Sequence, residues 1–256
     1  MNKELFESIL NKENDPKIKS SLILNFIRHA EKDKDNNITE EGIRQSKKMG
    51  EEIPLFNNLT IASYFTDVPR TKQTLDAINN NLENQAEKQD INVEFRTPIA
   101  LSSKLKWNKE SESQLEKINM IFKKIEKNQS FTKAVEWWLS ESEDAGNVNK
   151  WTNDFLKAIV TFLKLGTKLK ENNHLMLNFV THAGATDKFI LSLLKQKDIL
   201  EKKDSLDKLG GALKFLEKVS IKLLNLDNGE TKILLIFRDY NFEMKIEEIK
   251  KIIENL

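Results

Sequence analysis

Two histidines in this chain each come directly after a short apolar run. Arg28 and His29 follow Leu22–Ile27, and His182 follows Leu175–Val180. A neutral imidazole can attack phosphorus and carry the phosphoryl group as a covalent intermediate. An arginine presents a fixed fork of N–H donors that matches phosphate oxygens. These residue types therefore predict chemistry on a phosphoryl group.

A second arginine occupies the same kind of place. Arg70 lies just past the predicted strand Thr60–Thr66, at the start of a helix that opens with Pro69. The carboxyl ends of strands in an open α/β sheet face one crevice, and helix N-termini there offer aligned N–H groups to an anion. We therefore expect four catalytic residues to converge, and these are Arg28, His29, Arg70 and His182. Their positive charge would stabilise the transferring group without a metal or another cofactor.

Each of these residues also has a purely structural explanation when taken alone. An arginine at a helix start is commonly a surface or ion-pair residue, and Thr181-His182 could simply cap a helix. Their joint placement, each just past an apolar strand, favours the functional interpretation. The third histidine, His174, begins its predicted strand, so we expect a surface residue at the opposite end of the sheet.

The elements that must position these residues alternate between strands and helices. Apolar or alternating runs predict strands at 22–27, 60–66, 91–95 and 175–180. Helical spacing and capping residues predict helices at 39–52, 69–82, 109–125, 132–139, 148–170 and 187–194. An Asn-Gly pair between 219–226 and 231–237 predicts an antiparallel hairpin at a sheet edge, followed by a helix from about Glu243.

This order predicts an α/β fold, a three-layer sandwich with a central, mostly parallel sheet flanked by helices. The antiparallel C-terminal hairpin would lie at the edge of the sheet, and a helical insertion would occupy about 105–150. No linker rich in Gly, Pro or Ser divides the chain, so we expect residues 1–256 to form a single domain. Residues 1–20 would be an N-terminal extension, with a short helix over 1–10.

Composition excludes several classes of function. The 41 basic and 40 acidic residues leave a net charge of +1, which argues against a nucleic-acid partner. Cysteine is absent, so disulfides, thiolate metal sites and cysteine nucleophiles are excluded. The first 20 residues have no apolar core of a signal peptide, and no run approaches the roughly 20 apolar residues that span a bilayer. We expect a cytoplasmic protein with no membrane partner.

Four segments resemble the motifs of the histidine phosphatase superfamily, the phosphoglycerate mutase-like fold. Arg28–Lys32 and Ile38–Gln45 are similar to the opening Arg-His-Gly or Arg-His-Ala motif and its Leu-Thr-x-x-Gly-x-x-Gln continuation. Pro69–Thr74 is similar to the second arginine motif, and Phe179–Gly184 to the second histidine motif, usually Thr-His-x-Gly. The matching segments span roughly residues 22 to 195, and the C-terminal hairpin also fits the fold.

The resemblance implies a metal-independent phosphomonoester hydrolase that acts through a phosphohistidine intermediate. His29 would be the nucleophile, while Arg28, Arg70 and His182 would bind the phosphoryl group of the substrate and stabilise its transition state. The partner would be a small phosphorylated substrate or a phosphoprotein. Two alternatives stay open: a non-catalytic phosphate-binding or scaffold protein that keeps the pocket, and a phosphomutase, which we favour less.

The sequence departs from the family at the proton donor. The family's Leu-x-Glu segment corresponds here to Ile99–Ser103, which holds no carboxylate, and the Asp that follows the second histidine in acid phosphatases is Ala183. The acid for the leaving group is therefore unassigned. The stand-ins are Glu31, Glu110, Glu112 and Glu136, each of which is expected to be surface charge.

Four tryptophans lie in or near the predicted insertion, two of them in Thr132–Leu139. Core packing of the helices is the favoured explanation for this aromatic stretch. A substrate-binding aromatic wall is the alternative.

Overall fold

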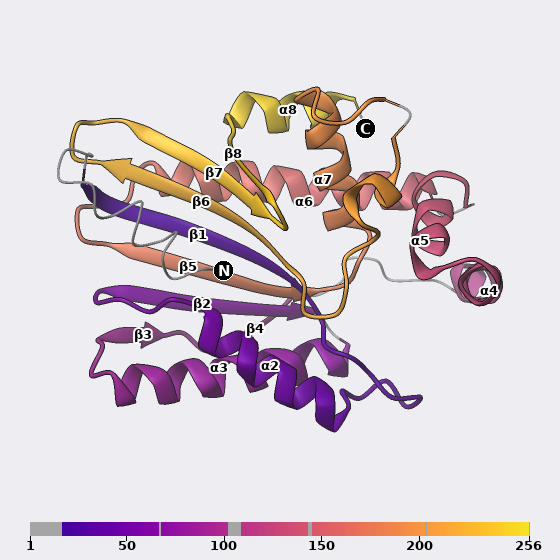
Figure 1. Cartoon of the computed structure of the whole chain (residues 1–256), viewed down its shortest axis with the longest axis horizontal. Coiled ribbons are helices and arrows are strands. Elements are labelled where there is room, and N and C mark those ends of the chain that lie inside the picture. The colour runs from indigo at the N-terminus through magenta and orange to yellow at the C-terminus, as the bar shows by residue number, and fades with distance from the viewer. Residues whose placement is uncertain (1–16, 67, 102–108, 143–144, 203, 256) are drawn as a thin grey trace. The chain divides into compact units, whose positions relative to one another are not determined.

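The computed structural model describes residues 17–66, 68–101, 109–142, 145–202 and 204–255 (Figure 1). Contacts divide the chain into two compact units. The first comprises residues 1–102, 163–181 and 215–244, and the second comprises 103–162, 182–214 and 245–256. The helix predicted over 1–10 lies outside the described residues.

The first unit holds a mixed sheet whose strand order is β3-β2-β5-β1-β6-β7-β8, with β4 also paired to β2 (Figure 1). Pairing is parallel from β3 and β4 through β2 and β5 to β1, and antiparallel from β1 through β6 and β7 to β8. The strands are β1 (Ile18–Arg28), β2 (Leu59–Thr66), β3 (Val93–Phe95), β4 (Ile99–Leu101), β5 (His174–Thr181), β6 (Lys218–Leu226), β7 (Thr231–Phe237) and β8 (Tyr240–Glu243). The predicted α/β fold with a mostly parallel sheet is confirmed.

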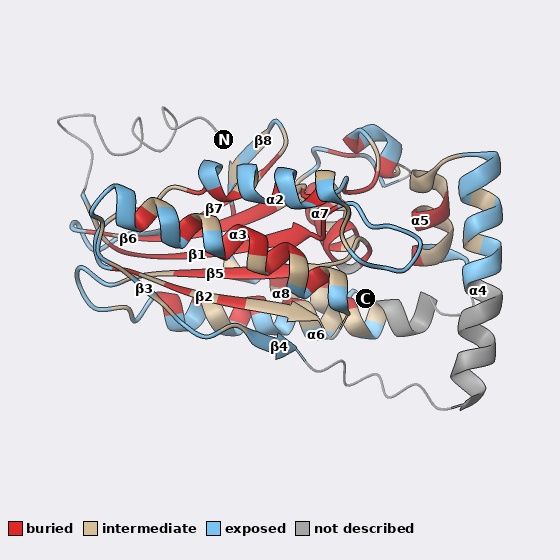
Figure 2. Cartoon of the chain, turned by 90° about the horizontal axis from the view of Figure 1, so that it is seen from below, coloured by how far each residue is buried: buried red, intermediate tan, exposed pale blue. Residues whose placement is uncertain are grey.

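The central strand β1 is buried along most of its length, as Figure 2 shows by colour. It lies between parallel β5 and antiparallel β6, so both of its edges are paired. The consecutive buried residues along it show that both of its faces are covered as well, which suits a nearly continuous apolar run. The strand is longer than the predicted 22–27, because its pairing with β5 and β6 extends the ladder at both ends. Its last residue, Arg28, pairs with Thr181, the last residue of β5.

The predicted C-terminal hairpin exists, but its predicted place at the sheet edge is wrong. β6 and β7 pair around a turn in which Gly229 has a φ of +86°. A further strand, β8, pairs with β7 and forms that edge of the sheet instead. The predicted terminal helix from about Glu243 therefore begins later, because Glu243 is the last residue of β8.

Two helices of the first unit pack on one face of the sheet. They are α2 (Glu40–Glu52) and α3 (Pro69–Lys88), and α3 runs six residues beyond the predicted end at 82. Ile53, Leu75 and Ile78 join Ile23 and Ile27 of β1 in one buried cluster. On the other face, a Cβ at Gly166 would meet Leu22 and Leu223, so the chain there lies directly on the sheet.

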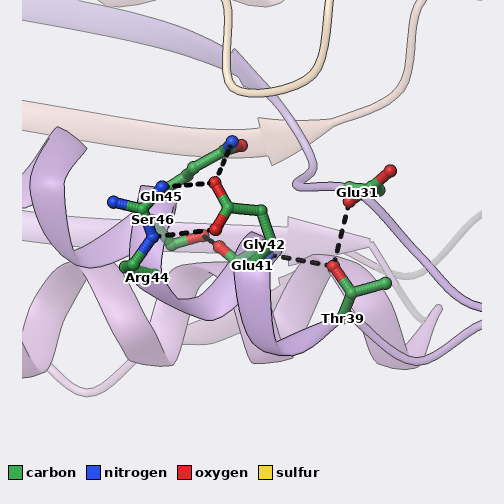
Figure 3. A network of polar contacts seen from close by, with 7 residues as sticks. All are labelled: Glu31, Thr39, Glu41, Gly42, Arg44, Gln45 and Ser46. Carbon is green, nitrogen blue, oxygen red and sulfur yellow. Dashed lines mark hydrogen bonds and ion pairs between the residues drawn. The ribbon is translucent and has the colours of Figure 1, made fainter.

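The N-terminus of α2 confirms its predicted cap. Thr39 Oγ1 accepts a hydrogen bond from the Gly42 N–H (2.9 Å) and donates to Glu31 Oε2 (3.2 Å) (Figure 3). A Cβ at Gly42 would come within 2.7 Å of the Glu31 carbonyl oxygen, so glycine allows the helix to approach the loop after β1. The cap thereby ties α2 to the loop that follows His29.

The second unit is helical in its described part. Its elements are α4 (Lys109–Asn128), α5 (Phe131–Ser140), α6 (Ala145–Gly166, whose last turn belongs to the first unit), α7 (Ala185–Gln196), the short 3₁₀ helix η1 (Leu206–Leu209) and α8 (Ile246–Glu254). The α-helices lie within a few residues of the predicted ranges, whereas η1 was not predicted. Within the unit, Thr132 Oγ1 accepts from the Ala212 N–H (3.1 Å), and Lys188 donates to the Leu139 carbonyl (3.3 Å).

Candidate active site at the carboxyl edge of the sheet

His29 leaves the sheet at the carboxyl end of β1 and is held there by its backbone. Its N–H donates to the Thr181 carbonyl of β5 (2.9 Å), and the next N–H, that of Ala30, donates to Thr74 Oγ1 of α3 (3.0 Å). His29 is 4% exposed. Anchoring from both sides leaves the imidazole little freedom to change its position.

The two ring nitrogens of His29 have different partners, which together define the tautomer. Nδ1 lies 2.7 Å from the carbonyl oxygen of Ala30. Because a carbonyl oxygen can only accept, Nδ1 carries the proton. Arg70 Nε–H donates to Nε2 over 3.1 Å, which requires a lone pair on that nitrogen. His29 is therefore a neutral imidazole with the Nε2 lone pair on the side of a guanidinium.

Arg70 is half-buried beside His29, and burial lowers its pKa from the ordinary value without removing its charge. Its NH1 also donates to Asn36 Oδ1 (3.4 Å), in the loop after β1. Gln73 fixes that loop on α3, because its Oε1 accepts from the Ile38 N–H (2.9 Å) and its Nε2 donates to Asn37 Oδ1 (3.0 Å). The arginine thus reaches from α3 to both His29 and the loop.

The threonines of the segment Pro69–Thr74 attach α3 to the sheet. Thr71 Oγ1 lies 2.8 Å from the Thr66 carbonyl at the end of β2 and 2.7 Å from the Val68 carbonyl. Thr74 Oγ1 donates to the Arg70 carbonyl (2.7 Å) and accepts from the Ala30 N–H (3.0 Å). The spacing of these residues therefore positions Arg70 against the end of β1.

Arg28 is 9% exposed and is placed by the segment that leads into β6. Its N–H donates to the Glu217 carbonyl (3.1 Å), and its carbonyl accepts from the Leu216 N–H (3.0 Å). The Arg28 guanidinium carbon lies 4.3 Å from the ring centroid of Phe215. The same ring lies 5.6 Å, centroid to centroid, from His29. Phe215 therefore contacts both residues.

The structure brings together three of the four predicted residues, namely Arg28, His29 and Arg70. His182, which is half-buried, directly follows β5 but belongs to the second unit, so its convergence with the other three stays a prediction. Its neighbour Gly184 has a φ of +117°, and its N–H donates to Asp187 Oδ2 (2.7 Å). Asp187 Oδ1 also accepts from the Leu213 N–H (2.7 Å), so this buried carboxylate fixes the start of α7.

The carboxylates considered as stand-in acids differ in their surroundings. Glu31 is exposed and accepts from Thr39 in the first unit. Glu136 is partly buried in the second unit and pairs with Lys133 (2.9 Å). The side chains of Glu110 and Glu112 lie outside the described residues. The proton donor therefore stays unassigned.

The prediction for His174 is right about its place and wrong about its exposure. It is the first residue of β5, at the opposite end of the strand from Thr181. The ring is half-buried, its Nδ1 lies 2.9 Å from Ser21 Oγ, and Phe56 packs edge-on at 5.0 Å. Burial lowers the pKa of His174. The start of the strand is not a free edge, because Ser21 of β1 and Phe56 in the loop before β2 cover the ring.

Sequence reasoning missed Asn36, Gln73 and Phe215. The first two lie in or against a polar loop with no periodicity, where nothing marks a residue as oriented inward. Phe215 lies far along the chain from Arg28 and His29, and only the pairing of β6 with β1 brings it to them. The aromatic stretch of α5 packs within its own unit, since Trp138 meets the position of a Cβ at Gly184.

Within the described ranges, no three His, Asp or Glu side chains are grouped so that they could hold a metal ion. None of the described helices combines the length and the apolar character needed to cross a membrane.

No family model and no curated protein matches this sequence. Among solved structures, the chain is similar to a mycobacterial glucosyl-3-phosphoglycerate phosphatase in complex with VO3 (14% identity, 84% of this chain and 98% of that chain, TM-score 0.39). It is also similar to a phosphoglycerate mutase from Plasmodium falciparum (13% identity, 86% of this chain and 91% of that chain, TM-score 0.31). A third similar structure, from Agrobacterium tumefaciens, carries the provisional name phosphohistidine phosphatase SixA (12% identity, 87% of this chain and 96% of that chain, TM-score 0.33).

Proposed function

We propose that this chain is a metal-independent phosphomonoester hydrolase of the histidine phosphatase type. His29 is the nucleophile, and Arg28, Arg70 and His182 bind the phosphoryl group. The substrate is a small phosphorylated molecule or a phosphoprotein. The observation that carries the proposal is the contact of Arg70 Nε–H with His29 Nε2 (3.1 Å), from which we infer a neutral ring whose Nδ1 donates to the Ala30 carbonyl.

This arrangement suits attack on phosphorus. Nucleophilic catalysis by histidine needs a neutral ring with a lone pair already aimed at the electrophile. A guanidinium beside that lone pair can exchange its contact with the ring for contacts with phosphate oxygens, since it offers several donors. The ring and the phosphate would then share one cation, and that cation stabilises the equatorial oxygens during transfer.

The reaction proceeds in two displacements. In the first, His29 Nε2 forms a bond to phosphorus as the ester P–O bond breaks, and the leaving oxygen takes a proton from an acid or from water. In the second, water attacks the phosphohistidine, the P–N bond breaks, and phosphate and neutral His29 are regenerated. If water instead of a positioned acid supplies that proton, we expect the first step to be about 10²–10⁴-fold slower for poor leaving groups. Phosphohistidine and acyl phosphates would be affected less.

The test is covalent trapping followed by mutation. Incubation with a labelled phosphomonoester should give acid-labile label on His29, and His29→Ala should abolish the label and lower turnover at least about 10³-fold. His174→Ala is the matched control, because it removes a half-buried histidine from the other end of β5. Label that persists in His29→Ala, or unchanged turnover in that variant, would refute the proposal.

A phosphate-binding protein without turnover is the second candidate, and the absence of a carboxylate at the family's acid positions favours it. Such a protein would bind phosphate or vanadate tightly yet hydrolyse no member of a broad phosphoester panel. Running the panel with and without a chelator also tests whether the activity is independent of metal. Exchange of phosphoryl groups between isomers without net release of phosphate would instead indicate a phosphomutase.

A further inference from the structure

We propose that Phe215 has two roles in this site: it holds the Arg28 guanidinium in place, and it forms an apolar surface for the organic group of the substrate. The site would then prefer phosphomonoesters whose organic group is a flat aromatic ring over those of polar alcohols. This inference rests on the proposed function, because it assumes that the phosphoryl group binds beside Arg28 and His29.

The first role follows from the contact between Phe215 and Arg28. The guanidinium carbon lies 4.3 Å from the ring centroid, which is the geometry of a cation–π interaction. The guanidinium is planar, so a ring beneath it fixes the plane in which its N–H donors lie. Phe215 is attached directly to the strand end, because the next residue, Leu216, donates its N–H to the Arg28 carbonyl (3.0 Å). The backbone of Phe215 is therefore held next to the arginine that its ring supports.

The second role follows from the part of the ring that the protein leaves uncovered. Phe215 is 40% exposed, although the neighbouring residues Arg28 and His29 are 9% and 4% exposed. Its ring lies 5.6 Å from the imidazole of His29, centroid to centroid. We infer that the organic group of an ester whose phosphoryl group binds at His29 Nε2 extends past this ring, because the ring is an exposed apolar surface beside the imidazole. Aromatic groups gain from offset or edge contacts at such distances, whereas hydroxyl groups lose water without gaining a partner.

Binding of non-hydrolysable analogues separates the two roles and does not depend on turnover. We compare phenylphosphonate with methylphosphonate in the wild type, Phe215→Ala and Phe215→Leu by calorimetry. Phe215→Ala should weaken methylphosphonate binding a few-fold through the loss of the contact with Arg28. It should weaken phenylphosphonate binding about tenfold more. Phe215→Leu should weaken methylphosphonate similarly but keep part of the preference for the phenyl compound.

Phe56→Leu is the matched control, because Phe56 packs edge-on against His174 at the other end of β5 and should leave both affinities unchanged. The inference is overturned if Phe215→Ala weakens both analogues equally, or neither, while the variant keeps its circular dichroism spectrum. If the wild type hydrolyses no ester yet shows the expected affinity ratios, the hydrolase proposal fails and the role of Phe215 stands. If phenyl phosphate and glycerol 2-phosphate are both hydrolysed but their kcat/KM ratio is unchanged in Phe215→Ala, the hydrolase stands and the inference fails.

Discussion

Lys222 is a buried cation in the middle of β6, and it should make the stability of this protein rise with pH. The residue is 4% exposed and lies opposite Ile23 of β1 and Leu234 of β7. Burial, with a smaller contribution from the nearby Lys218 cation, lowers the pKa of Lys222 to about 8. We expect Lys222→Met, which keeps the length of the side chain and removes its charge, to stabilise the protein at neutral pH.

The size of the effect follows from proton linkage. The ordinary lysine pKa of 10.5 applies to the unfolded chain, whereas the folded value is about 8. Between these values the unfolded state binds a proton that the folded state does not, so the free energy of unfolding rises with pH. Below pH 8 Lys222 is charged in the folded state, so the full cost of burying that charge lowers the free energy of unfolding. The difference between the unfolded and folded pKa values corresponds to about 3 kcal/mol, since one pKa unit is about 1.4 kcal/mol.

The measurement is urea unfolding of the wild type and Lys222→Met at several pH values between 7 and 10.5. The variant should be more stable by up to about 3 kcal/mol at pH 7, and the difference should shrink toward pH 10.5. Burial also lowers the pKa of Lys218, so the stability of Lys222→Met should still rise somewhat with pH. The quantity to compare is therefore the difference in unfolding free energy between the variant and the wild type. Lys232→Met, at an exposed lysine of β7, is the control. A difference that does not change with pH would refute the reasoning.

Two further predictions concern backbone and capping positions. Thr39→Ala should cost about 1 kcal/mol of unfolding free energy, because the Gly42 N–H loses its acceptor, and Thr39→Ser should restore most of it. Gly184→Ala should cost at least about 2 kcal/mol, because φ is +117° and the added Cβ would collide with Trp138. Gly229→Ala, where φ is +86° but nothing lies within 4 Å, should cost only about 1 kcal/mol. Thermal unfolding measures the stability of all four variants. Equal losses of stability in Gly184→Ala and Gly229→Ala would contradict the steric argument.

Much of the fold was predictable from local patterns. The strand β1 was marked by its apolar run, α2 by the cap Thr39, and the β6–β7 hairpin by its Asn-Gly pair. Each of these signals acts within a few residues, so it requires no knowledge of the rest of the chain. The placement of Arg28, His29 and Arg70 at one edge followed from the strands, and the structure brings those three side chains together.

The strands that were missed depend on distant partners. β4 has three residues, all exposed, and it is a strand only because it pairs with the end of β2. β8 has four residues, and the turn before it contains Arg238 with a φ of +51°, where a Gly or Asn would have signalled a hairpin. In both cases the ladder with a neighbouring strand overrides weak local preferences. Phe215 was missed for the same reason, since its importance arises from pairing across the sheet.

The apolar runs that predicted the strands also contain polar residues that help to place the site. Asn25 of β1 pairs in register with Asn178 of β5 and Ser220 of β6. Asn25 Nδ2 donates to Asn178 Oδ1 (2.9 Å), and Ser220 Oγ donates to Asn25 Oδ1 (2.7 Å). A slip of one residue would turn these side chains to the other face and leave buried polar groups without partners, at a cost of about 1–3 kcal/mol for each group.

The same register brings Arg28 beside Thr181, three positions further along β1 and β5. Because the His29 N–H donates to the Thr181 carbonyl, the position of the imidazole depends on this alignment. An all-apolar core would fill the same space but would discriminate less between registers, since apolar side chains can pack in several ways. The buried asparagines thus connect the packing of the sheet to the geometry at its edge, because the register that satisfies them is also the one in which the His29 N–H meets the Thr181 carbonyl.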